Sequence, residues 1–136
     1  MTELPVVVIG AGPQGLAVAA HLTERGNEAI VVERGAGPAA AVSEWGHVRL
    51  FSHWSELTDA AARRLLETSG WRAPVVGYPT GEEWVSQYLA PLAEALGERV
   101  RYSTTVTGVS RRGRDRVVDS GRTGQPFVVH TVDAEG

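Results

Sequence analysis

Three glycines in the segment "VVVIGAGPQGLAVAAHL", residues 6–22, constrain the fold of this chain more than any other feature. The apolar run from Pro5 to Ile9, which precedes them, is typical of a strand buried on both faces. A small-residue run with helical spacing follows them. Gly10 permits a tight turn, Gly12 lets the backbone approach a pyrophosphate, and Gly15 lets a helix pack closely on the sheet. The segment therefore predicts a strand, a phosphate-binding turn and a helix.

An acidic residue ends the next apolar run, "EAIVVE" at residues 28–33. Glu33 stands 23 positions after Gly10. It can accept hydrogen bonds from both ribose hydroxyls of an adenine dinucleotide. A 2′-phosphate would meet a like charge there, which disfavours NADP, although the neighbouring Arg34 reduces that repulsion. NAD and FAD both remain compatible with these residues.

A long insertion separates this run from the next convincing strand. That strand, "RVRYSTTVTGVS", begins at Arg99, and the intervening residues 34–98 contain all four tryptophans. An NAD dehydrogenase usually reaches its third strand within a normal crossover length. The insertion therefore favours a larger cofactor, FAD. The alternative is an NAD-binding enzyme or regulatory module with an unusual insertion.

The pattern as a whole predicts one Rossmann-like α/β domain over residues 1–136. A small parallel sheet is expected from strands near 5–9, 28–33 and 99–104, with helices packed against it, and a β-meander from about 105 to 133. The basic cluster "SRRGRDR" lies within the meander segment and is expected to be an exposed hairpin tip. Because no aromatic residues interleave with these arginines, a solvated turn is favoured over a nucleic-acid site.

Two helices are expected inside the insertion. The first covers residues 57–70, with Thr58 or Ser55 as its N-cap. The second covers residues 80–97 and opens on a capping box formed by Thr80 and Glu83. Pro91 removes a backbone donor within the second helix, so a kink or break is expected there.

Composition excludes several kinds of chemistry. All 13 basic residues are arginine and no cysteine is present, which excludes Schiff-base lysines, thiolate nucleophiles and a CxxC redox pair from these residues. The net charge of −3 argues against nucleic acid or an anionic membrane as the main partner. His47 and His53 have no ligand at metal-site spacing, so no metal is expected. With neither a signal peptide nor an apolar run of spanning length, the chain is expected to be cytoplasmic.

The quoted motifs also carry a family resemblance. "VVVIGAGPQGLAVAAHLTERGNEAIVVERG" resembles the N-terminal FAD-binding fingerprint of two-dinucleotide flavoproteins. "WGHVRLFSHW", followed by "GYPTGEEWVSQYL", is similar to class B flavin monooxygenases, the flavin-containing monooxygenase-like group. The resemblance covers nearly the whole chain. In place of the "GGxW" turn of that group, this chain has "AAAVSEW".

The resemblance implies roles for individual residues. Trp45, His47 and Arg49 fall where the group approaches the riboflavin half of FAD, and Val106 falls where a backbone pair meets the adenine edge. Glu33 would hold the adenosine ribose, with Arg34 beside it. The FAD pyrophosphate would be lined by Gly10, Gly12, Pro13, Gln14 and Gly15. No residue is indicated as a general acid or base.

The function expected from the resemblance is that of an FAD-dependent, NAD(P)H-using oxidoreductase, monooxygenase-like, or of its N-terminal FAD-binding segment. The chain reaches Gly136 without a second glycine fingerprint, so NAD(P)H would bind outside it and the chain alone is expected to be inactive. Its small-molecule substrate is not indicated. The alternatives are the NAD-binding module and a non-catalytic, truncated nucleotide-binding remnant. An incomplete sheet would leave an edge exposed, so association between copies is expected.

Overall fold

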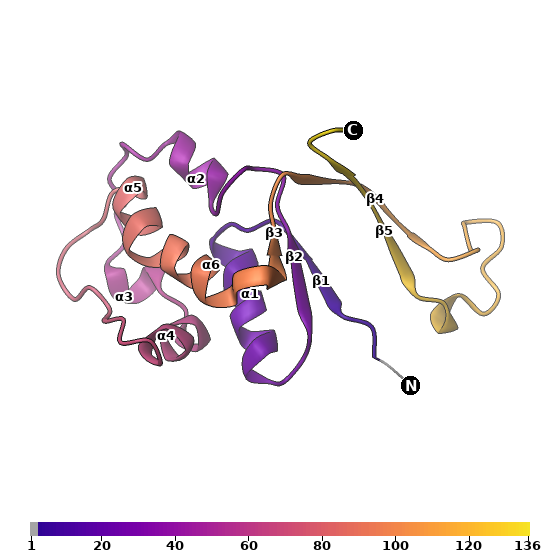
Figure 1. The fold of residues 1–136 in the computed structure, drawn as a ribbon, viewed down its shortest axis with the longest axis horizontal. Helices are drawn as coiled ribbons and strands as arrows, with labels where there is room; N and C mark the ends of the chain where they lie inside the picture. The colour runs from indigo at the N-terminus through magenta and orange to yellow at the C-terminus, as the bar shows by residue number, and fades with distance from the viewer. Residues whose placement is uncertain (1–2) are drawn as a thin grey trace.

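The computed structural model describes residues 3–136 and contains a three-stranded parallel sheet. Strand β2 (Ala29–Val32) lies between β1 (Val6–Ile9) and β3 (Val100–Arg101), as Figure 1 shows. Val6 stands opposite Ala29, and Val31 stands opposite Val100. This is the α/β arrangement predicted from the sequence, although the third strand is shorter than residues 99–104.

Helix α1 (Pro13–Glu24) connects β1 to β2 and buries Leu16, Ala19 and Ala20. These side chains belong to the same hydrophobic core as Val31 and Val100 of the sheet. Helices α4 (Ala60–Glu67) and α6 (Ala90–Leu96) pack against α1 and against each other. The core therefore lies on the side of the sheet that carries α1, and the insertion between β2 and β3 extends that core.

The insertion contains more and shorter helices than the sequence predicts. It consists of α2 (Ala40–Glu44), α3 (Trp54–Leu57), α4, α5 (Gly81–Trp84), a π-helical turn, α6 and a short 3₁₀ turn. The helix expected at residues 57–70 is α4 alone, because Thr58 is extended and separates α4 from α3. Asp59 is the N-cap in place of Thr58 or Ser55, since its carboxylate accepts the Ala62 N–H at 3.0 Å.

The predicted interruption around Pro91 takes the form of a π-helical turn over Val85–Leu89. The capping box is present, because Thr80 and Glu83 each accept the backbone N–H of the other. Pro91 cannot donate to the Gln87 carbonyl four residues earlier. That carbonyl instead accepts the Trp71 indole N–H at 2.8 Å. The missing helical hydrogen bond is thus replaced by a side chain from the preceding loop.

The segment after the sheet is a two-stranded hairpin, where the sequence predicted a β-meander. Strand β4 (Thr104–Arg111) pairs antiparallel with β5 (Phe127–Asp133) and extends away from the helices (Figure 1). The loop between them is held by arginine side chains that donate to backbone carbonyls. Arg111 reaches Gln125 at 2.7 Å and Arg114 reaches Ser120 at 2.6 Å. The basic cluster is therefore a solvated loop that the arginines themselves stabilise.

Strand β1 is not buried on both faces. Val6 is 44% exposed and Ile9 is 58% exposed. The β-branched pattern indicated a strand with two covered faces, but β1 is an edge strand and the helices pack on one side of the sheet. Within residues 3–136, no helix is both long enough and apolar enough to cross a membrane.

Candidate functional site

The three glycines of the first turn meet three different steric requirements. Gly10 has φ +100°, a conformation that side-chain-bearing residues rarely adopt. A Cβ on Gly15 would lie 1.9 Å from the Gly10 carbonyl oxygen, so the helix approaches the strand end too closely for any side chain. A Cβ on Gly12 would have no atom within 4 Å. A Cβ on Gly10 would likewise have no atom within 4 Å, so the backbone at Gly10 and Gly12 faces open space, as expected where a ligand has to approach it.

The N-terminus of α1 opens toward the same space. Gly12 is its N-cap and no side chain caps it. Pro13 has no N–H, and the Leu16 N–H donates to the Gly12 carbonyl at 3.0 Å. The N–H groups of Gln14 and Gly15 lie in the first turn, where an α-helix provides no internal acceptor. Together with the helix dipole, they form a suitable site for an anion.

Glu33 is joined to the glycine turn by a direct hydrogen bond. The side chain is 8% exposed, and its Oε1 accepts the Ala11 N–H at 3.0 Å. The other carboxylate oxygen accepts the Gly35 N–H at 2.5 Å. Because a carboxylate offers about four acceptor positions, it retains capacity for ribose hydroxyls. The end of β2 and the glycine turn thus form one continuous site.

Gly35 and Tyr102 also belong to this site, and the sequence did not indicate them. A Cβ on Gly35 would lie 2.9 Å from Glu33 Oε2 and 2.5 Å from the Ala40 Cβ. Burial, together with the nearby charge of Glu33, raises the pKa of Tyr102. The only sequence signal for Gly35 is a small residue two positions after the acid, and Tyr102 gives no such signal.

The remaining candidates near the ribose end lie on the connection to the hairpin. Arg34 is exposed beside Glu33. The Glu33 carbonyl accepts the Thr104 N–H at 3.0 Å, which places the start of β4 next to the acid. Val106 lies two residues further along β4, opposite Thr131, where the pairing with β5 becomes irregular before Gly108.

The structure places Trp45, His47 and Arg49 on a separate segment. Residues 46–50 run beside residues 79–82, connected by backbone hydrogen bonds such as Leu50 N–H to the Pro79 carbonyl at 2.8 Å. The Arg49 guanidinium donates to the Tyr78 carbonyl and lies 3.9 Å from the Glu83 carboxylate. Trp45 packs over Gly81, whereas His47 is exposed. These three residues are neighbours of one another, and none lines the cavity beside the glycine turn.

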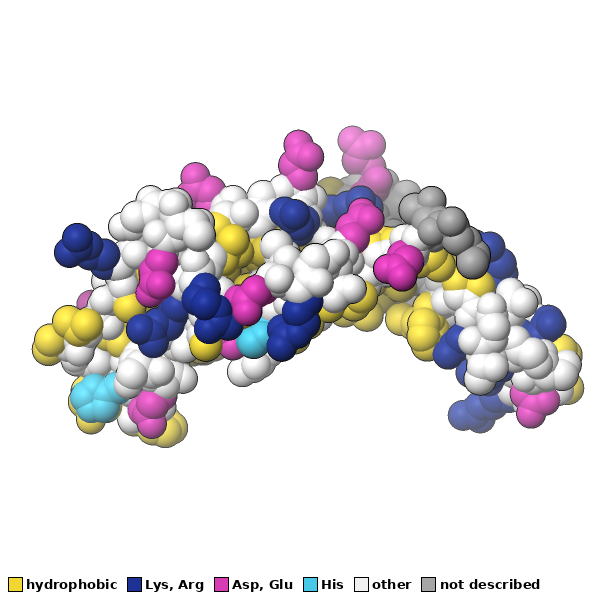
Figure 2. Space-filling model, turned by 90° about the horizontal axis from the view of Figure 1, so that it is seen from below, with side chains coloured by type: hydrophobic (Ala, Val, Ile, Leu, Met, Phe, Trp, Pro, Cys, Tyr) yellow, Lys and Arg dark blue, Asp and Glu magenta, His cyan; other side chains and the backbone are white. Residues whose placement is uncertain are grey.

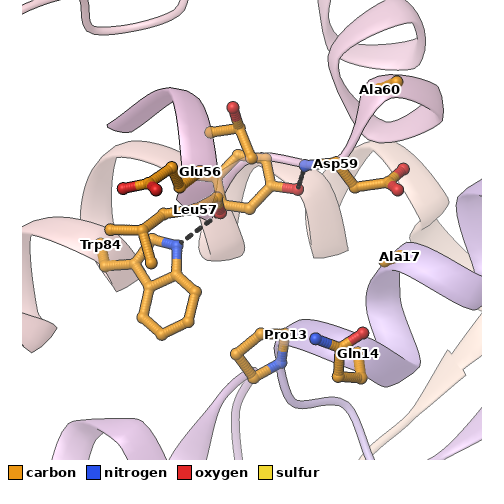
Figure 3. A pocket seen from close by; sticks show the side chains of 10 residues that line it. Pro13, Gln14, Ala17, Glu56, Leu57, Asp59, Ala60 and Trp84 are labelled. Carbon is orange, nitrogen blue, oxygen red and sulfur yellow. Dashed lines mark hydrogen bonds between the residues drawn. The ribbon is translucent and has the colours of Figure 1, made fainter. Parts of the chain in front are cut away.

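A cavity of about 400 Å³ lies between the start of α1 and the α3–α4 connection (Figure 3). Trp84 closes one side, with its indole N–H held by the Leu57 carbonyl at 3.0 Å. The Tyr88 hydroxyl accepts the Asp59 N–H at 2.9 Å, and burial raises the pKa of that hydroxyl. The cavity was not predicted from the sequence, because its walls come from distant parts of the chain. The lining residues are Pro13, Gln14, Ala17, Glu56, Leu57, Thr58, Asp59, Ala60, Trp84 and Tyr88.

A hydrogen-bond network connects α1 to the start of α4 beside this cavity. His21 Nε2 lies 2.8 Å from Asp59 Oδ1, and the Arg25 guanidinium lies 3.0 Å from His21 Nδ1. Partial burial raises the pKa of Asp59, but hydrogen bonds from the Ala62 N–H and His21 outweigh it and hold the pKa below its ordinary value. Asp59 is therefore charged at neutral pH.

The lowered pKa of Asp59 makes a pH-dependent contribution to stability. A depressed carboxyl pKa stabilises the folded chain above the unfolded value of about 3.9, and the contribution is lost as pH falls through the folded value. Asp59→Asn should cost about 1 kcal/mol or less at neutral pH, since the pair is partly exposed. Thermal melts of both proteins should converge below about pH 4. A difference in melting temperature between wild type and Asp59→Asn that stays constant with pH would contradict this expectation. Asp119→Asn, a change at an exposed residue, is the control.

Comparison with known proteins assigns the chain to a family. The sequence model described as pyridine nucleotide-disulphide oxidoreductase matches residues 7–125, which is more than half of the chain. The chain therefore belongs to the pyridine nucleotide-disulphide oxidoreductase family. No curated protein matches it significantly.

Several solved structures share its fold. The bacillithiol disulfide reductase Bdr (YpdA) from Bacillus cereus is 22% identical with a TM-score of 0.71, matched over 99% of this chain and 36% of its own. A flavin-containing monooxygenase from Stenotrophomonas maltophilia is 24% identical with a TM-score of 0.63, matched over 100% of this chain and 35% of its own. The OTEMO complex with FAD and NADP is 20% identical with a TM-score of 0.64, matched over 96% of this chain and 23% of its own. The chain thus spans about a third or less of the length of these proteins.

Proposed function

We propose that this chain is the N-terminal FAD-binding part of an FAD-dependent, NAD(P)H-using oxidoreductase of the monooxygenase-like kind, acting in the cytoplasm. The observation that carries the proposal is the direct hydrogen bond between Glu33 and the glycine turn, beside the open space at Gly12. It places a ribose acceptor directly beside a pyrophosphate site, although α1 and β2 separate the two in the sequence. The family match supports the oxidoreductase class.

Each part of the site would hold a different part of the cofactor. The N–H groups of Gln14 and Gly15 would donate to the pyrophosphate, and Glu33 would accept from the adenosine ribose. The assignment of Trp45 and Arg49 to the riboflavin half rests on the family resemblance. Bound FAD would accept electrons from NAD(P)H and, in a monooxygenase, react with molecular oxygen. The described residues supply position and charge, and NAD(P)H would bind outside them.

FAD is preferred to NAD because of the helical insertion. Residues 34–98 build the cavity beside Gln14, which an adenine–ribose–pyrophosphate site alone does not require. The OTEMO structure of the same fold was solved with FAD and NADP. A nucleotide-binding module specific for NAD is the alternative, since Glu33 fits the adenosine ribose of either cofactor.

Calorimetric titration of the 136-residue chain with FAD and with NAD tests the proposal. We expect FAD to bind and NAD to bind more weakly. Displacement of FAD by NAD at comparable concentrations would favour the NAD-binding module. If neither dinucleotide bound, the chain would be a non-binding remnant and the proposal would be wrong.

Glu33→Gln tests the ribose contact. Glutamine keeps the size of the side chain but offers one neutral acceptor where the carboxylate offers two charged ones. Loss of a charge-assisted hydrogen bond costs about 1–3 kcal/mol, so the Kd for FAD should rise roughly 5- to 150-fold. Calorimetry on Glu33→Gln and on Glu28→Gln, an exposed change before the opposite end of β2, provides the comparison. An unchanged Kd for Glu33→Gln would remove this residue from the site.

A further inference from the structure

Two residues in the described part of the chain adopt a left-handed backbone without being glycine. Within residues 3–136 these are Ala39, with φ +52°, and Ser103, with φ +51°. A Cβ makes this conformation sterically unfavourable, so it persists only where surrounding contacts enforce it, and such positions cluster at binding sites. Ser103 follows β3, where the hairpin leaves the helical body, and Figure 2 shows the hollow between these two parts. Ala39 precedes α2 and is 2% exposed. Both residues therefore require contacts that hold them in place.

The backbone at Ser103 interrupts the regular alternation of a strand. In a strand, successive N–H groups point to opposite sides. Here the Ser103 N–H donates to the Gly35 carbonyl at 2.9 Å, and the Thr104 N–H donates to the Glu33 carbonyl at 3.0 Å. The left-handed conformation at Ser103 therefore lets two consecutive N–H groups hold the same segment, the connection that follows β2.

Each oxygen of the Glu33 carboxylate is bound by a residue that one of the two strained positions holds. The Gly35 N–H donates to Oε2 at 2.5 Å, and the Gly35 carbonyl accepts the Ser103 N–H. The Ala11 N–H donates to Oε1 at 3.0 Å, and the Ala11 carbonyl accepts the Ala39 N–H at 2.8 Å. Because Glu33 is also only 8% exposed, its carboxylate has one defined orientation that contacts within the chain enforce.

We propose that Ser103 and Ala39 are positioning residues, which hold the Glu33 carboxylate in the orientation that accepts the ribose of an adenine dinucleotide. The inference rests on the proposed function, which assigns Glu33 to the ribose. A carboxylate that is already ordered loses no rotamer freedom on binding, whereas a loosely held one loses it and binds more weakly. The two strained residues contribute through their backbone N–H groups, because these fix the residues that bind the carboxylate.

Ser103 is the position to test, because a larger side chain at the buried Ala39 would also overpack the core. Asparagine and glycine tolerate the left-handed region, whereas the β-branched valine does not. Ser103→Val should therefore raise the Kd for FAD roughly 3- to 10-fold by calorimetry, and Ser103→Asn and Ser103→Gly should bind as the wild-type chain does. Ser110→Val is the matched control, since it makes the same change at an exposed residue of the extended strand β4. Thermal melts check that each variant folds.

A double-mutant comparison tests whether Ser103 acts through Glu33. Combined with Glu33→Gln, Ser103→Val should raise the Kd by less than about twofold, because the carboxylate that it positions is already lost. A general defect in folding would raise the Kd equally in both backgrounds, and that result would overturn the proposal.

Amide hydrogen exchange of the chain without added FAD provides a measurement that does not depend on binding. Exchange at the Gly35 N–H should be roughly tenfold faster in Ser103→Val than in the wild-type chain, and unchanged in Ser103→Asn. A wild-type chain that bound no FAD would overturn the proposed function, and the positioning role with it. In a chain that does bind FAD, equal Kd values for Ser103→Val and wild type, or equal Gly35 exchange in the two, would overturn the positioning role alone.

Discussion

Gly12→Val should abolish FAD binding while leaving the fold intact. Gly12 has φ −82° and ψ −173°, an extended conformation in which valine is unstrained, and its Cβ would meet no protein atom within 4 Å. The valine side chain would instead occupy the space through which a pyrophosphate reaches the N–H groups of Gln14 and Gly15. Calorimetric titration with FAD should give no detectable heat of binding, while the free energy of unfolding changes by about 0.5 kcal/mol or less.

Gly124→Val is the control for this change. Gly124 lies in the hairpin loop, and a Cβ there also has no atom within 4 Å. The Gly124→Val protein should bind FAD as the wild-type chain does. If the Gly12→Val protein bound FAD with wild-type affinity, the pyrophosphate would not be held at this turn.

Gly15→Ala should destabilise the chain, although alanine is the better helix former by about 1 kcal/mol. The added Cβ would lie 1.9 Å from the Gly10 carbonyl oxygen and 3.0 Å from the Gly10 carbonyl carbon. Both are backbone atoms, so α1 has to move away from the end of β1 and disturb the core around Leu16. Overpacking of this kind costs on the order of 3 kcal/mol, which outweighs the propensity gain.

Urea unfolding of Gly15→Ala, with Gly124→Ala as the control, measures this effect. The control should match the wild-type chain closely. A Gly15→Ala protein as stable as wild type or more so would mean that helix propensity dominates, and that α1 does not pack as closely on β1 as the geometry indicates.

The parts of the fold that were predictable from sequence are those fixed by local chemistry. The glycine turn, the strand ending in Glu33 and the capping box of Thr80 and Glu83 each depend on a few residues close together in the chain. The interruption before Pro91 was predictable for the same reason, because proline lacks the helical donor. The identity of its replacement, the Trp71 indole, was not, since Trp71 belongs to a loop with no regular pattern.

The features that were missed depend on contacts between distant residues. The exposure of β1 depends on whether a second layer covers the sheet. A run such as "VVVI" is compatible with a strand covered on one face and with a strand covered on both. Ser55, Thr58 and Asp59 are all suitable N-cap residues near the start of α4. The N-cap is Asp59, which also contacts His21 and Tyr88, residues distant in the sequence. The cavity beside Gln14 requires Trp84, which lies 70 positions further along the chain.

An NMR titration of the isotope-labelled chain with FAD tests the central claim most directly, because it locates the binding site residue by residue. We expect the largest changes in backbone amide shifts at Ala11, Gly12, Gln14, Gly15 and Gly35, the groups that surround the open space at the glycine turn and the Glu33 carboxylate. Amides of the hairpin loop, such as Gly124, should not move. An absence of shifts, or shifts confined to residues outside the glycine turn and the end of β2, would contradict the assignment of this site to an adenine dinucleotide.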